Sequence, residues 1–233
     1  MGLAMRLAEL FYSIQGEGKL MGMPSVFVRA SGCNLRCVWC DTPYASWQPE
    51  GEDATVAAIM DRIGEFPARH AVITGGEPMI MPDLPELCDE FKSRGYHVTI
   101  ETAATVFAPV KLDLASLSPK LSNSTPRLRE AGRFARTHEQ NRLNVGVIQQ
   151  FIDRSPEFQL KFVVCEPGDM GEIHDLLRKL RGWSPGDVLL MPEGTTQTVL
   201  DSRAGWMSET CKKEGFRFCP RLQVMLYGNR RGT

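Results

Sequence analysis

The chain has 233 residues, of which 42% are hydrophobic and 24% are charged, and its formal net charge at pH 7 is -1. This composition supplies enough apolar material for one core, and the near-zero charge argues against direct binding to nucleic acid or to a membrane surface. The sequence has no apolar signal core near its start and no run approaching the roughly 20 apolar residues of a membrane span. With no repeat or linker apparent, we expect a single cytoplasmic domain over residues 1–233.

Strand-like and helix-like segments alternate along the chain. Two strands come first, at residues 5–13 and 24–30, with a glycine-rich turn between them. Residues 116–142 are polar and rich in turn-forming residues. Hydrophobic spacing predicts the other elements: helix 54–65, strand 71–73, helix 83–94, strands 96–101 and 110–114, helix 141–152, strand 159–165, helix 170–181, strand 187–191, helix 200–214 and a last strand at 222–227.

This alternation predicts an α/β fold in which neighbouring strands are parallel, because each helix returns the chain to the same edge of the sheet. The sequence contains about six such units, fewer than the eight of a closed barrel. We therefore expect a partial, open TIM-like barrel of about six parallel strands, with the functional side chains at the strand C-terminal ends.

Seven cysteines require an explanation in a chain of this kind. An odd number without a secretion signal argues against a disulfide framework. Four of them lie singly in apolar or helical settings and are interpreted as small buried side chains: Cys88, Cys165, Cys211 and Cys219. The other three, Cys33, Cys37 and Cys40, have the spacing C-x3-C-x2-C directly after a predicted strand.

Three thiolates this close together favour a soft metal centre. A complete zinc site would need a fourth ligand, and none follows locally; a zinc knuckle with a remote fourth ligand stays an alternative. On a four-iron cluster, three cysteines leave one iron without a protein ligand, and that position can hold the amino and carboxylate groups of S-adenosylmethionine (SAM). Trp39 matches the aromatic residue commonly found between the last two cysteines in the radical SAM superfamily, which this loop resembles.

A glycine-rich segment, Thr74-Gly75-Gly76-Glu77-Pro78, follows a predicted buried strand. Two adjacent glycines let a backbone approach a ligand closely, although a plain strand-to-helix turn would use the same residues. The segment resembles the GGEP motif of radical SAM enzymes, which contacts the amino group of SAM. In combination with the cysteine loop it indicates a radical SAM fold.

Further segments resemble the 7-carboxy-7-deazaguanine synthase family over nearly the whole chain. They are Tyr12–Gly18, Cys40-Asp41-Thr42, Ile100-Glu101-Thr102, Ser118-Pro119-Lys120, Leu160–Val164, Met191–Gly194, Gly215-Phe216-Arg217, Pro220-Arg221-Leu222 and Gly228–Gly232. The resemblance implies a lyase that converts 6-carboxy-5,6,7,8-tetrahydropterin to 7-carboxy-7-deazaguanine and ammonia by radical ring contraction, a step of queuosine and 7-deazapurine biosynthesis. It also implies that SAM is used catalytically, and that Mg²⁺ assists.

The resemblance assigns roles to residues at matching positions. The cluster that generates the radical would be a 4Fe-4S cluster on Cys33, Cys37 and Cys40, and Thr42 would touch Mg²⁺. The cofactor contacts would come from Trp39, Asp41, Gly76, Glu77, Ser118, Pro119 and Lys120. The pterin contacts would come from Ile14, Gln15, Gly16, Glu17, Arg29, Thr74 and Glu101.

The residue chemistry fits a pterin, which presents a guanidine-like edge and a carboxylate. Glu17 and Glu101 can accept hydrogen bonds from the edge, Gln15 can donate and accept, and Arg29 offers a planar fork for the carboxylate. As an alternative, Arg29 and Glu101 could simply pair with each other. Gln223 departs from the family pattern, in which histidine is frequent at that position.

The basic residues near the C-terminus, Arg217, Arg221, Arg230 and Arg231, are interpreted as a solvated surface or an interface. The expected partners are the pterin, an electron donor such as a flavodoxin, and a second copy of the chain in a homodimer. Two rival functions stay open: an activating enzyme that makes a glycyl radical on another protein, and a zinc-binding interaction module without catalysis. The Gln15 and Glu17 turn argues against the first, and the colour of the reconstituted protein would decide the second.

Overall fold

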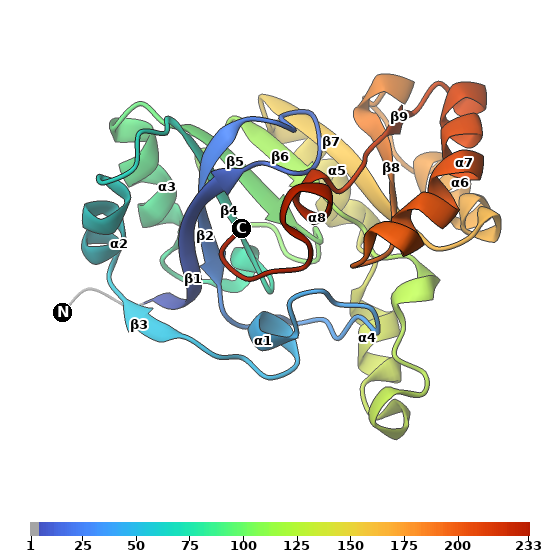
Figure 1. The fold of residues 1–233 in the computed structure, drawn as a ribbon, viewed down its shortest axis with the longest axis horizontal. Coiled ribbons are helices and arrows are strands. Elements are labelled where there is room, and N and C mark those ends of the chain that lie inside the picture. The colour runs from blue at the N-terminus through green and yellow to red at the C-terminus, as the bar shows by residue number, and fades with distance from the viewer. Residues whose placement is uncertain (1–4) are drawn as a thin grey trace.

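A computed structural model describes residues 5–233 of the chain. Its centre is one nine-stranded sheet with the order β3-β1-β2-β4-β5-β6-β7-β8-β9 (Figure 1). The strands are β1 (Met5–Ile14), β2 (Pro24–Ala30), β3 (Glu52–Ala54), β4 (His70–Gly75), β5 (His97–Thr102), β6 (Leu114–Leu117), β7 (Glu157–Val164), β8 (Val188–Pro192) and β9 (Arg217–Phe218).

The sheet is mixed and open. β1 pairs antiparallel with both β2 and β3, and every neighbouring pair from β2 to β9 is parallel. Within the described residues the two edge strands, β3 and β9, are not paired with each other, so the barrel does not close. The expected open α/β barrel is confirmed; the parallel part has the six longer strands β2 and β4–β8, and the two-residue β9 extends it.

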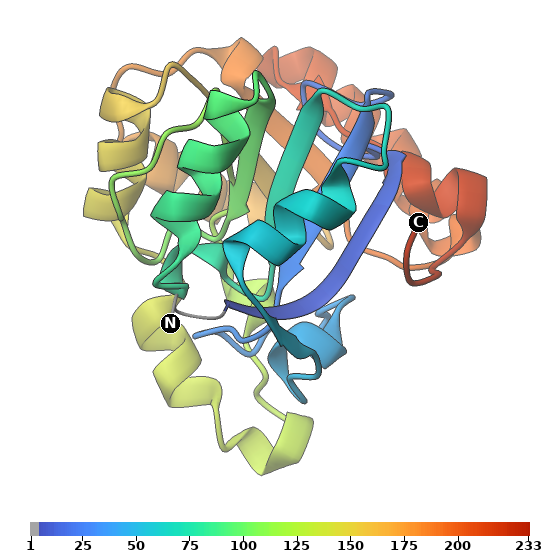
Figure 2. The same ribbon diagram turned by 90° about the vertical axis from the view of Figure 1, so that its left-hand side faces the viewer.

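The longer helices cover the convex side of the curved sheet (Figure 2). The helices are α1 (Pro43–Ser46), α2 (Val56–Ile63), α3 (Leu84–Ser93), α4 (Ala135–Asn141), α5 (Val145–Arg154), α6 (Met170–Leu177), α7 (Gln197–Glu214) and α8 (Leu222–Tyr227). Side-chain caps begin three of them: Thr55, Asn144 and Thr196 each accept a hydrogen bond from a backbone N–H three residues on. The main core lies between the longer helices and the sheet, and it includes Ile59, Phe91, Phe151, Leu176 and Met207.

Three predicted elements differ from the structure. Residues 222–227 form helix α8 and not a last strand, because β9 already occupies the edge beside β8 and the short apolar run has no strand to pair with. The strand expected at 110–114 lies at Leu114–Leu117, where all four residues are buried and Ser116 interrupts the apolar signal. The turn-rich stretch 116–142 contains helix α4, whose sequence is almost entirely polar.

Within residues 5–233 no helix combines the length and the apolar character that crossing a membrane requires.

A buried histidine joins three neighbouring strands. His70 is 4% exposed, and its Nδ1 and Nε2 atoms are hydrogen-bonded to Ser25 Oγ at 2.6 Å and to Thr99 Oγ1 at 2.9 Å. Burial, reinforced by His97 beside it, lowers the pKa of His70 from 6.5 to about 4, and the more distant charge of Asp113 opposes this. A histidine that is neutral in the folded state contributes stability that is complete above pH 6.5 and is lost as the pH falls through about 4.

We therefore expect the free energy of unfolding to fall by about 2–3 kcal/mol through this group between neutral and acidic pH. Denaturant titrations at a series of pH values would measure it in the parent and in His70→Asn. The asparagine variant should start less stable and show a shallower pH dependence. Equal slopes in His70→Asn and the parent would contradict the assignment.

Candidate active site

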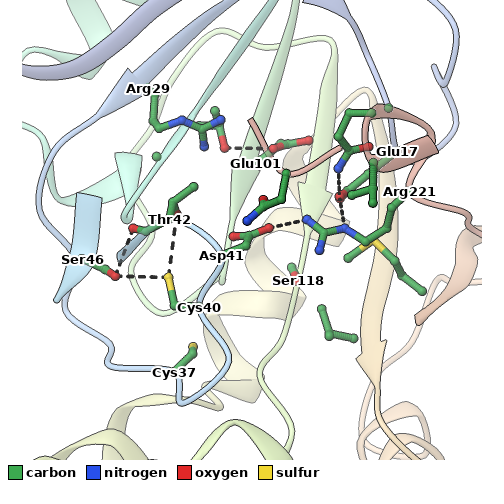
Figure 3. Close-up of a pocket in the computed structure, with 18 of the residues that line it drawn as sticks. Glu17, Arg29, Cys37, Cys40, Asp41, Thr42, Ser46, Glu101, Ser118 and Arg221 are labelled. Carbon is green, nitrogen blue, oxygen red and sulfur yellow. Dashed lines mark hydrogen bonds and ion pairs between the residues drawn. The ribbon is translucent and has the colours of Figure 1, made fainter. Parts of the chain in front are cut away.

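A cavity of about 470 Å³ lies at the C-terminal ends of the parallel strands, in the volume range of small-molecule sites (Figure 3). Strands β4 to β8 each contribute wall residues at that end, because parallel strands all present their C-terminal ends at the same edge. Most predicted site residues line the cavity: Ile14, Gln15, Gly16, Glu17, Arg29, Cys33, Cys37, Trp39, Cys40, Asp41, Thr42, Thr74, Gly76, Glu101, Ser118 and Lys120.

Three cysteines occupy one end of this cavity. Cys40 Sγ lies 3.1 Å from Ser46 Oγ and 3.7 Å from Thr42 Oγ1, and the backbone N–H of Leu35 donates to Cys33 Sγ at 3.3 Å (Figure 3). Burial raises the pKa values of the Cys33 and Cys37 thiols to about 12, so they are neutral until a cation binds. No three His, Cys, Asp or Glu side chains in the described part of the chain converge as a single-ion site.

The conformation of the cysteine loop is fixed by hydrogen bonds from a distant segment. His138, on α4, is 2% exposed; its Nδ1 accepts from the backbone N–H of Arg36 at 3.1 Å and its Nε2 lies 2.9 Å from Ser124 Oγ. The backbone N–H of Val38 donates to the carbonyl of Ser124 at 2.8 Å. Trp47 Nε1 donates to the carbonyl of Cys37 at 2.9 Å.

Replacing His138 by alanine is expected to leave the Arg36 N–H without an acceptor and to destabilise the loop by about 1–3 kcal/mol. The measurement is the rate at which reconstituted protein loses iron to a chelator, and we expect a roughly tenfold faster loss. His138→Gln retains an acceptor and should recover part of the difference. An unchanged rate in the alanine variant would show that His138 does not hold the loop.

Adjacent glycines allow the end of β4 to pack against the start of the cysteine loop. A Cβ at Gly76 would lie 2.0 Å from the carbonyl oxygen of Gly32, and one at Gly75 would lie 2.2 Å from that of Ala30. Gly76 and Glu77 donate backbone hydrogen bonds to the same two carbonyls, at 3.1 and 2.9 Å. The glycine pair therefore brings the two predicted motifs together, and Gly76 also faces the cavity.

Two predicted cofactor residues lie behind the cavity wall. Glu77 is fully buried, and its carboxylate accepts from Thr102 Oγ1 at 2.6 Å and from the backbone N–H groups of Ala103 and Met79 at 2.8 and 3.1 Å. Burial raises the pKa of Glu77, and these hydrogen bonds oppose the rise. Pro119 is buried between Ser118 and Lys120, which do line the cavity. Neither residue lines the cavity, and the Glu77 carboxylate holds the backbone of the wall through Met79 and Ala103.

The wall beside the cysteines carries a cation. Lys120 Nζ donates to Ser118 Oγ at 2.7 Å and lies 5.8 Å from the centroid of the Trp39 ring. The indole Nε1 of Trp39 donates to Asn123 Oδ1 at 3.2 Å, which fixes the ring. Lys120 has no carboxylate partner among the ion pairs of the described residues, so its charge is available to an anionic group such as the SAM carboxylate.

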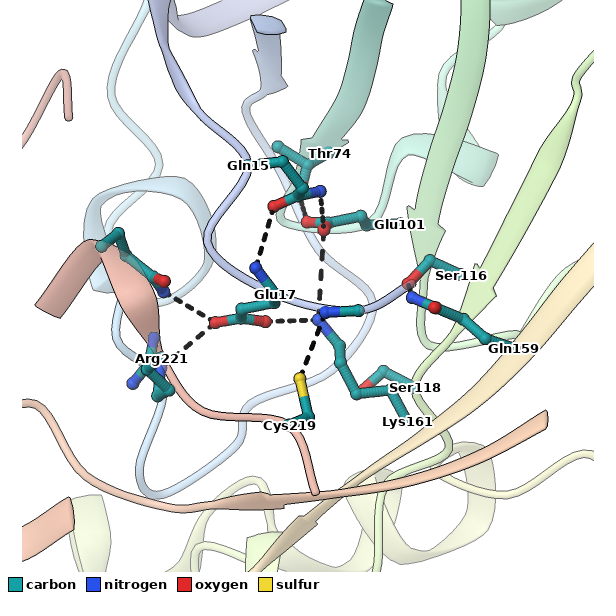
Figure 4. Close-up of polar contacts among 12 residues, drawn as sticks. Gln15, Glu17, Thr74, Glu101, Ser116, Ser118, Gln159, Lys161, Cys219 and Arg221 are labelled. Atoms are coloured by element: carbon teal, nitrogen blue, oxygen red, sulfur yellow. Dashed lines mark hydrogen bonds and ion pairs between the residues drawn. The ribbon is translucent and has the colours of Figure 1, made fainter. Parts of the chain in front are cut away.

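At the other end of the cavity, polar side chains surround Glu101. Its Oε1 accepts from Gln15 Nε2 at 3.2 Å and its Oε2 from Thr74 Oγ1 at 2.8 Å (Figure 4). Gln15 and Thr74 are 5% and 6% exposed. The carboxylate of Glu101 keeps lone pairs beyond these two bonds and is suited to accept from a ligand.

Glu17 is enclosed by protein cations. Its carboxylate pairs with Lys161 and, at 3.2 Å, with Arg221 Nε, and it accepts from Gln223 Nε2 at 2.7 Å (Figure 4). Burial by itself raises the pKa of Glu17, but the charges of Lys161 and Arg221 outweigh it and hold the pKa well below its usual range. Most of its acceptor capacity is used within the protein, so Glu17 offers less to a ligand than Glu101 does.

Sequence reasoning missed Lys161 and misplaced Arg221. Lys161 is 5% exposed, lines the cavity and lies 4.0 Å from Glu101 as well as beside Glu17. Arg221 is 7% exposed, pairs with Asp41 and donates to the carbonyl of Gly194 at 2.6 Å. The interpretation of Arg221 as a surface residue was therefore wrong. For Lys161 the sequence did offer a signal, because it is a lysine within the otherwise apolar predicted strand 159–165.

Arg29 is already paired. Its Nε donates to Glu9 Oε2 at 2.7 Å, and the same oxygen accepts from the Tyr44 hydroxyl at 2.6 Å. The alternative that Arg29 pairs with Glu101 was wrong. Arg231 reaches the other oxygen of Glu9 at 3.4 Å and, with Arg230, lines the mouth of the cavity.

The fold and the cysteine loop indicate the class of enzyme to which the chain belongs, and comparison with known proteins supports the same class. Residues 27–143 match the model of the Radical SAM superfamily. The QueE crystal structure from Escherichia coli superposes with a TM-score of 0.71 at 26% identity and covers 94% of each chain. SuiB of Streptococcus suis bound to its precursor peptide shares the fold, with a TM-score of 0.53 at 14% identity over 87% of this chain and 54% of its own. The chain is a member of the radical SAM superfamily.

Two relatives narrow the assignment from the superfamily to one enzyme family. The 7-carboxy-7-deazaguanine synthase of Rhodopirellula baltica is 43% identical over 227 residues, covering 97% of this chain and 88% of the relative. That of Halobacterium salinarum is 43% identical over 238 residues, covering 98% and 92%. The chain belongs to the 7-carboxy-7-deazaguanine synthase family.

Proposed function

We propose that this chain converts 6-carboxy-5,6,7,8-tetrahydropterin to 7-carboxy-7-deazaguanine and ammonia, as a lyase of queuosine and 7-deazapurine biosynthesis that uses SAM catalytically. One observation carries the proposal: a single cavity has three cysteines at one end and the Gln15, Thr74 and Glu101 array at the other. The cysteine end fits a 4Fe-4S cluster with SAM, and these cofactors, when bound, supply the radical that starts the ring contraction. The array fits the polar edge of a pterin.

The chain's own residues would bind the cofactors and orient the substrate. We propose that Cys33, Cys37 and Cys40 hold the cluster, and that Lys120 and the backbone at Gly76 receive the carboxylate and amino groups of SAM. The other SAM contacts would come from Trp39, Asp41 and Ser118. Glu77 and Pro119 would support this wall from behind.

At the substrate end, Glu101 would accept from the guanidine-like edge of the pterin, with Gln15 and Thr74 fixing its carboxylate. Arg29 would attract the pterin carboxylate while Glu9 holds the guanidinium in place. Ile14 and Gly16 would supply backbone groups, and Glu17 would orient Lys161. Thr42 places a hydroxyl oxygen, a ligand type that Mg²⁺ prefers, beside Cys40, so we propose it as a Mg²⁺ contact.

The test is anaerobic turnover of cluster-reconstituted protein with SAM, Mg²⁺, a reductant and the carboxytetrahydropterin, followed by mass spectrometry. Formation of 7-carboxy-7-deazaguanine without matching stoichiometric deoxyadenosine supports the reaction and the catalytic use of SAM together. Formation of deoxyadenosine without 7-carboxy-7-deazaguanine would agree with radical SAM chemistry but would contradict the proposed substrate.

We further propose one domain, because all nine strands of the described residues belong to one sheet. A cytoplasmic setting would keep the seven free thiols reduced.

A homodimer is supported by exposed apolar side chains on α8, where Met225 and Leu226 are 55% and 53% exposed. Light scattering after size-exclusion chromatography would measure the mass in solution, and the mass of a monomer would contradict the proposed homodimer.

A further inference from the structure

A basic arm, defined as residues 127–136, projects from the body of the molecule on the side of the cysteine loop (Figures 1 and 2). It contains four arginines and one glutamate, whereas the whole chain has a net charge of -1. The arginines are Arg127, Arg129, Arg133 and Arg136. Positive charge is therefore concentrated on one projection of a chain that is otherwise slightly acidic.

The arm also exposes an apolar side chain. Leu128 is 91% exposed, more than any other large hydrophobic side chain among residues 5–233. Its neighbour Arg127 has a side chain that is 68% exposed although it lies 3.4 Å from Glu139, and Arg133 and Arg136 are exposed as well. On the cysteine loop, Val38 is 38% exposed. An exposed apolar contact flanked by like charges is suited to a brief encounter with a protein of opposite charge.

The arm is connected to the cluster ligands by direct contacts. Arg129 Nη1 donates to the carbonyl of Val38 at 3.2 Å, and its guanidinium carbon lies 3.7 Å from the centroid of the Trp47 ring. Trp47 in turn donates to the carbonyl of Cys37 at 2.9 Å. A protein bound on the arm would thus sit beside the loop that holds the cluster.

The radical chemistry proposed above needs one electron to enter the cluster. Resting on that function, we propose that the basic arm and Val38 form the docking surface for a small acidic one-electron carrier of the flavodoxin type. In the encounter the carrier is oxidised by one electron and the cluster is reduced by one electron, with no bond formed or broken. The exposed leucine favours a protein partner over RNA, whose recognition relies on charge and stacking.

The test uses the cluster-reconstituted holoenzyme and a purified acidic flavodoxin reduced to its hydroquinone. The charge-reversal variant is Arg127→Glu/Arg133→Glu/Arg136→Glu, which leaves the Arg129 contacts in place. A matched control, Lys179→Glu/Arg181→Glu/Lys213→Glu, reverses exposed charges near the C-terminal ends of α6 and α7, at the opposite edge of the sheet. Three readouts are needed: the dissociation constant for oxidised flavodoxin, the rate of cluster bleaching on mixing with reduced flavodoxin in the absence of pterin, and the binding of unfractionated tRNA.

We expect the arm variant to bind flavodoxin at least roughly tenfold more weakly and to be reduced correspondingly more slowly, with the difference shrinking as salt is added. Reduction by dithionite should stay within about twofold of the parent, and the control should match the parent with both reductants. Parent-like binding and bleaching in the arm variant would overturn the proposal. So would loss of tRNA binding with flavodoxin reduction unchanged, since the arm would then be a nucleic-acid site. Because bleaching needs no pterin, the outcome is independent of the ring contraction.

Discussion

Replacing Cys37 by alanine is expected to abolish formation of 7-carboxy-7-deazaguanine and to lower bound iron from roughly four atoms per chain to near none. The physical reason is the number of ligands: three thiolates already leave one iron open, and two cannot retain the cluster against loss to solvent. The loop would also leave a gap beside the carbonyl that accepts from Trp47 at 2.9 Å. Iron analysis and the visible absorption spectrum after anaerobic reconstitution measure the effect.

Cys211→Ala is the matched control. Cys211 is 4% exposed in helix α7, packs in the main core and does not line the cavity. Its loss should cost about 1 kcal/mol of stability and leave bound iron and turnover unchanged. A brown Cys37→Ala protein with a four-iron spectrum, or a colourless parent that binds zinc, would remove the cluster assignment.

The second large effect is expected at Arg221, which lies between Asp41 on the cofactor wall and Glu17 on the substrate wall. Arg221→Gln would leave the buried carboxylate of Glu17 without this counter-charge, at a cost of about 3–5 kcal/mol, and would leave Asp41, whose side chain is 39% exposed, without its ion pair. Burial would then raise the pKa of Glu17 with only Lys161 and the Gln223 hydrogen bond opposing it. We expect kcat/KM for the pterin to fall by roughly 10²–10³-fold, with weaker SAM binding as well.

Steady-state kinetics with dithionite as reductant and equilibrium dialysis of SAM would measure the two effects separately. Arg221→Lys keeps the charge but not the fork that reaches two carboxylates, so its loss should be intermediate. Arg217→Gln, at an exposed arginine nearby in the sequence, should behave as the parent. Circular dichroism would confirm that each variant is folded. Equal kinetics for Arg221→Gln and Arg217→Gln would show that Arg221 does not link the two walls.

Gln223 has a position that the sequence could not explain. Its Nε2 donates to Glu17, while its Oε1 is buried without a partner among residues 5–233, and a Cβ at Gly16 would lie 1.9 Å from that oxygen. Gln223 thus packs against the Gln15–Glu17 turn at the substrate end of the cavity. Glutamine serves as a neutral donor there, so the contact does not titrate near neutral pH as a histidine would.

The sequence by itself determined the features that depend on neighbouring residues. The C-x3-C-x2-C spacing, the Thr74–Pro78 segment and the alternation of strands and helices are local patterns, and each indicated its structure because backbone geometry over a few residues sets it. The parallel order followed as well, because crossover helices return the chain to the same sheet edge. Local signals failed where a short segment suited two structures, as at 222–227, which became α8.

Only the tertiary structure decided which charges meet. Glu17 is 204 residues from Arg221 and 144 residues from Lys161 in the chain, yet it pairs with both. Arg29 has Glu9 as its partner and not Glu101, because antiparallel β1 places Glu9 opposite Arg29. Burial then sets the strength of these pairs, since a charge withdrawn from water is stable only beside its counter-charge. A sequence records which residues carry charge, and the packed sheet determines which of them are buried together.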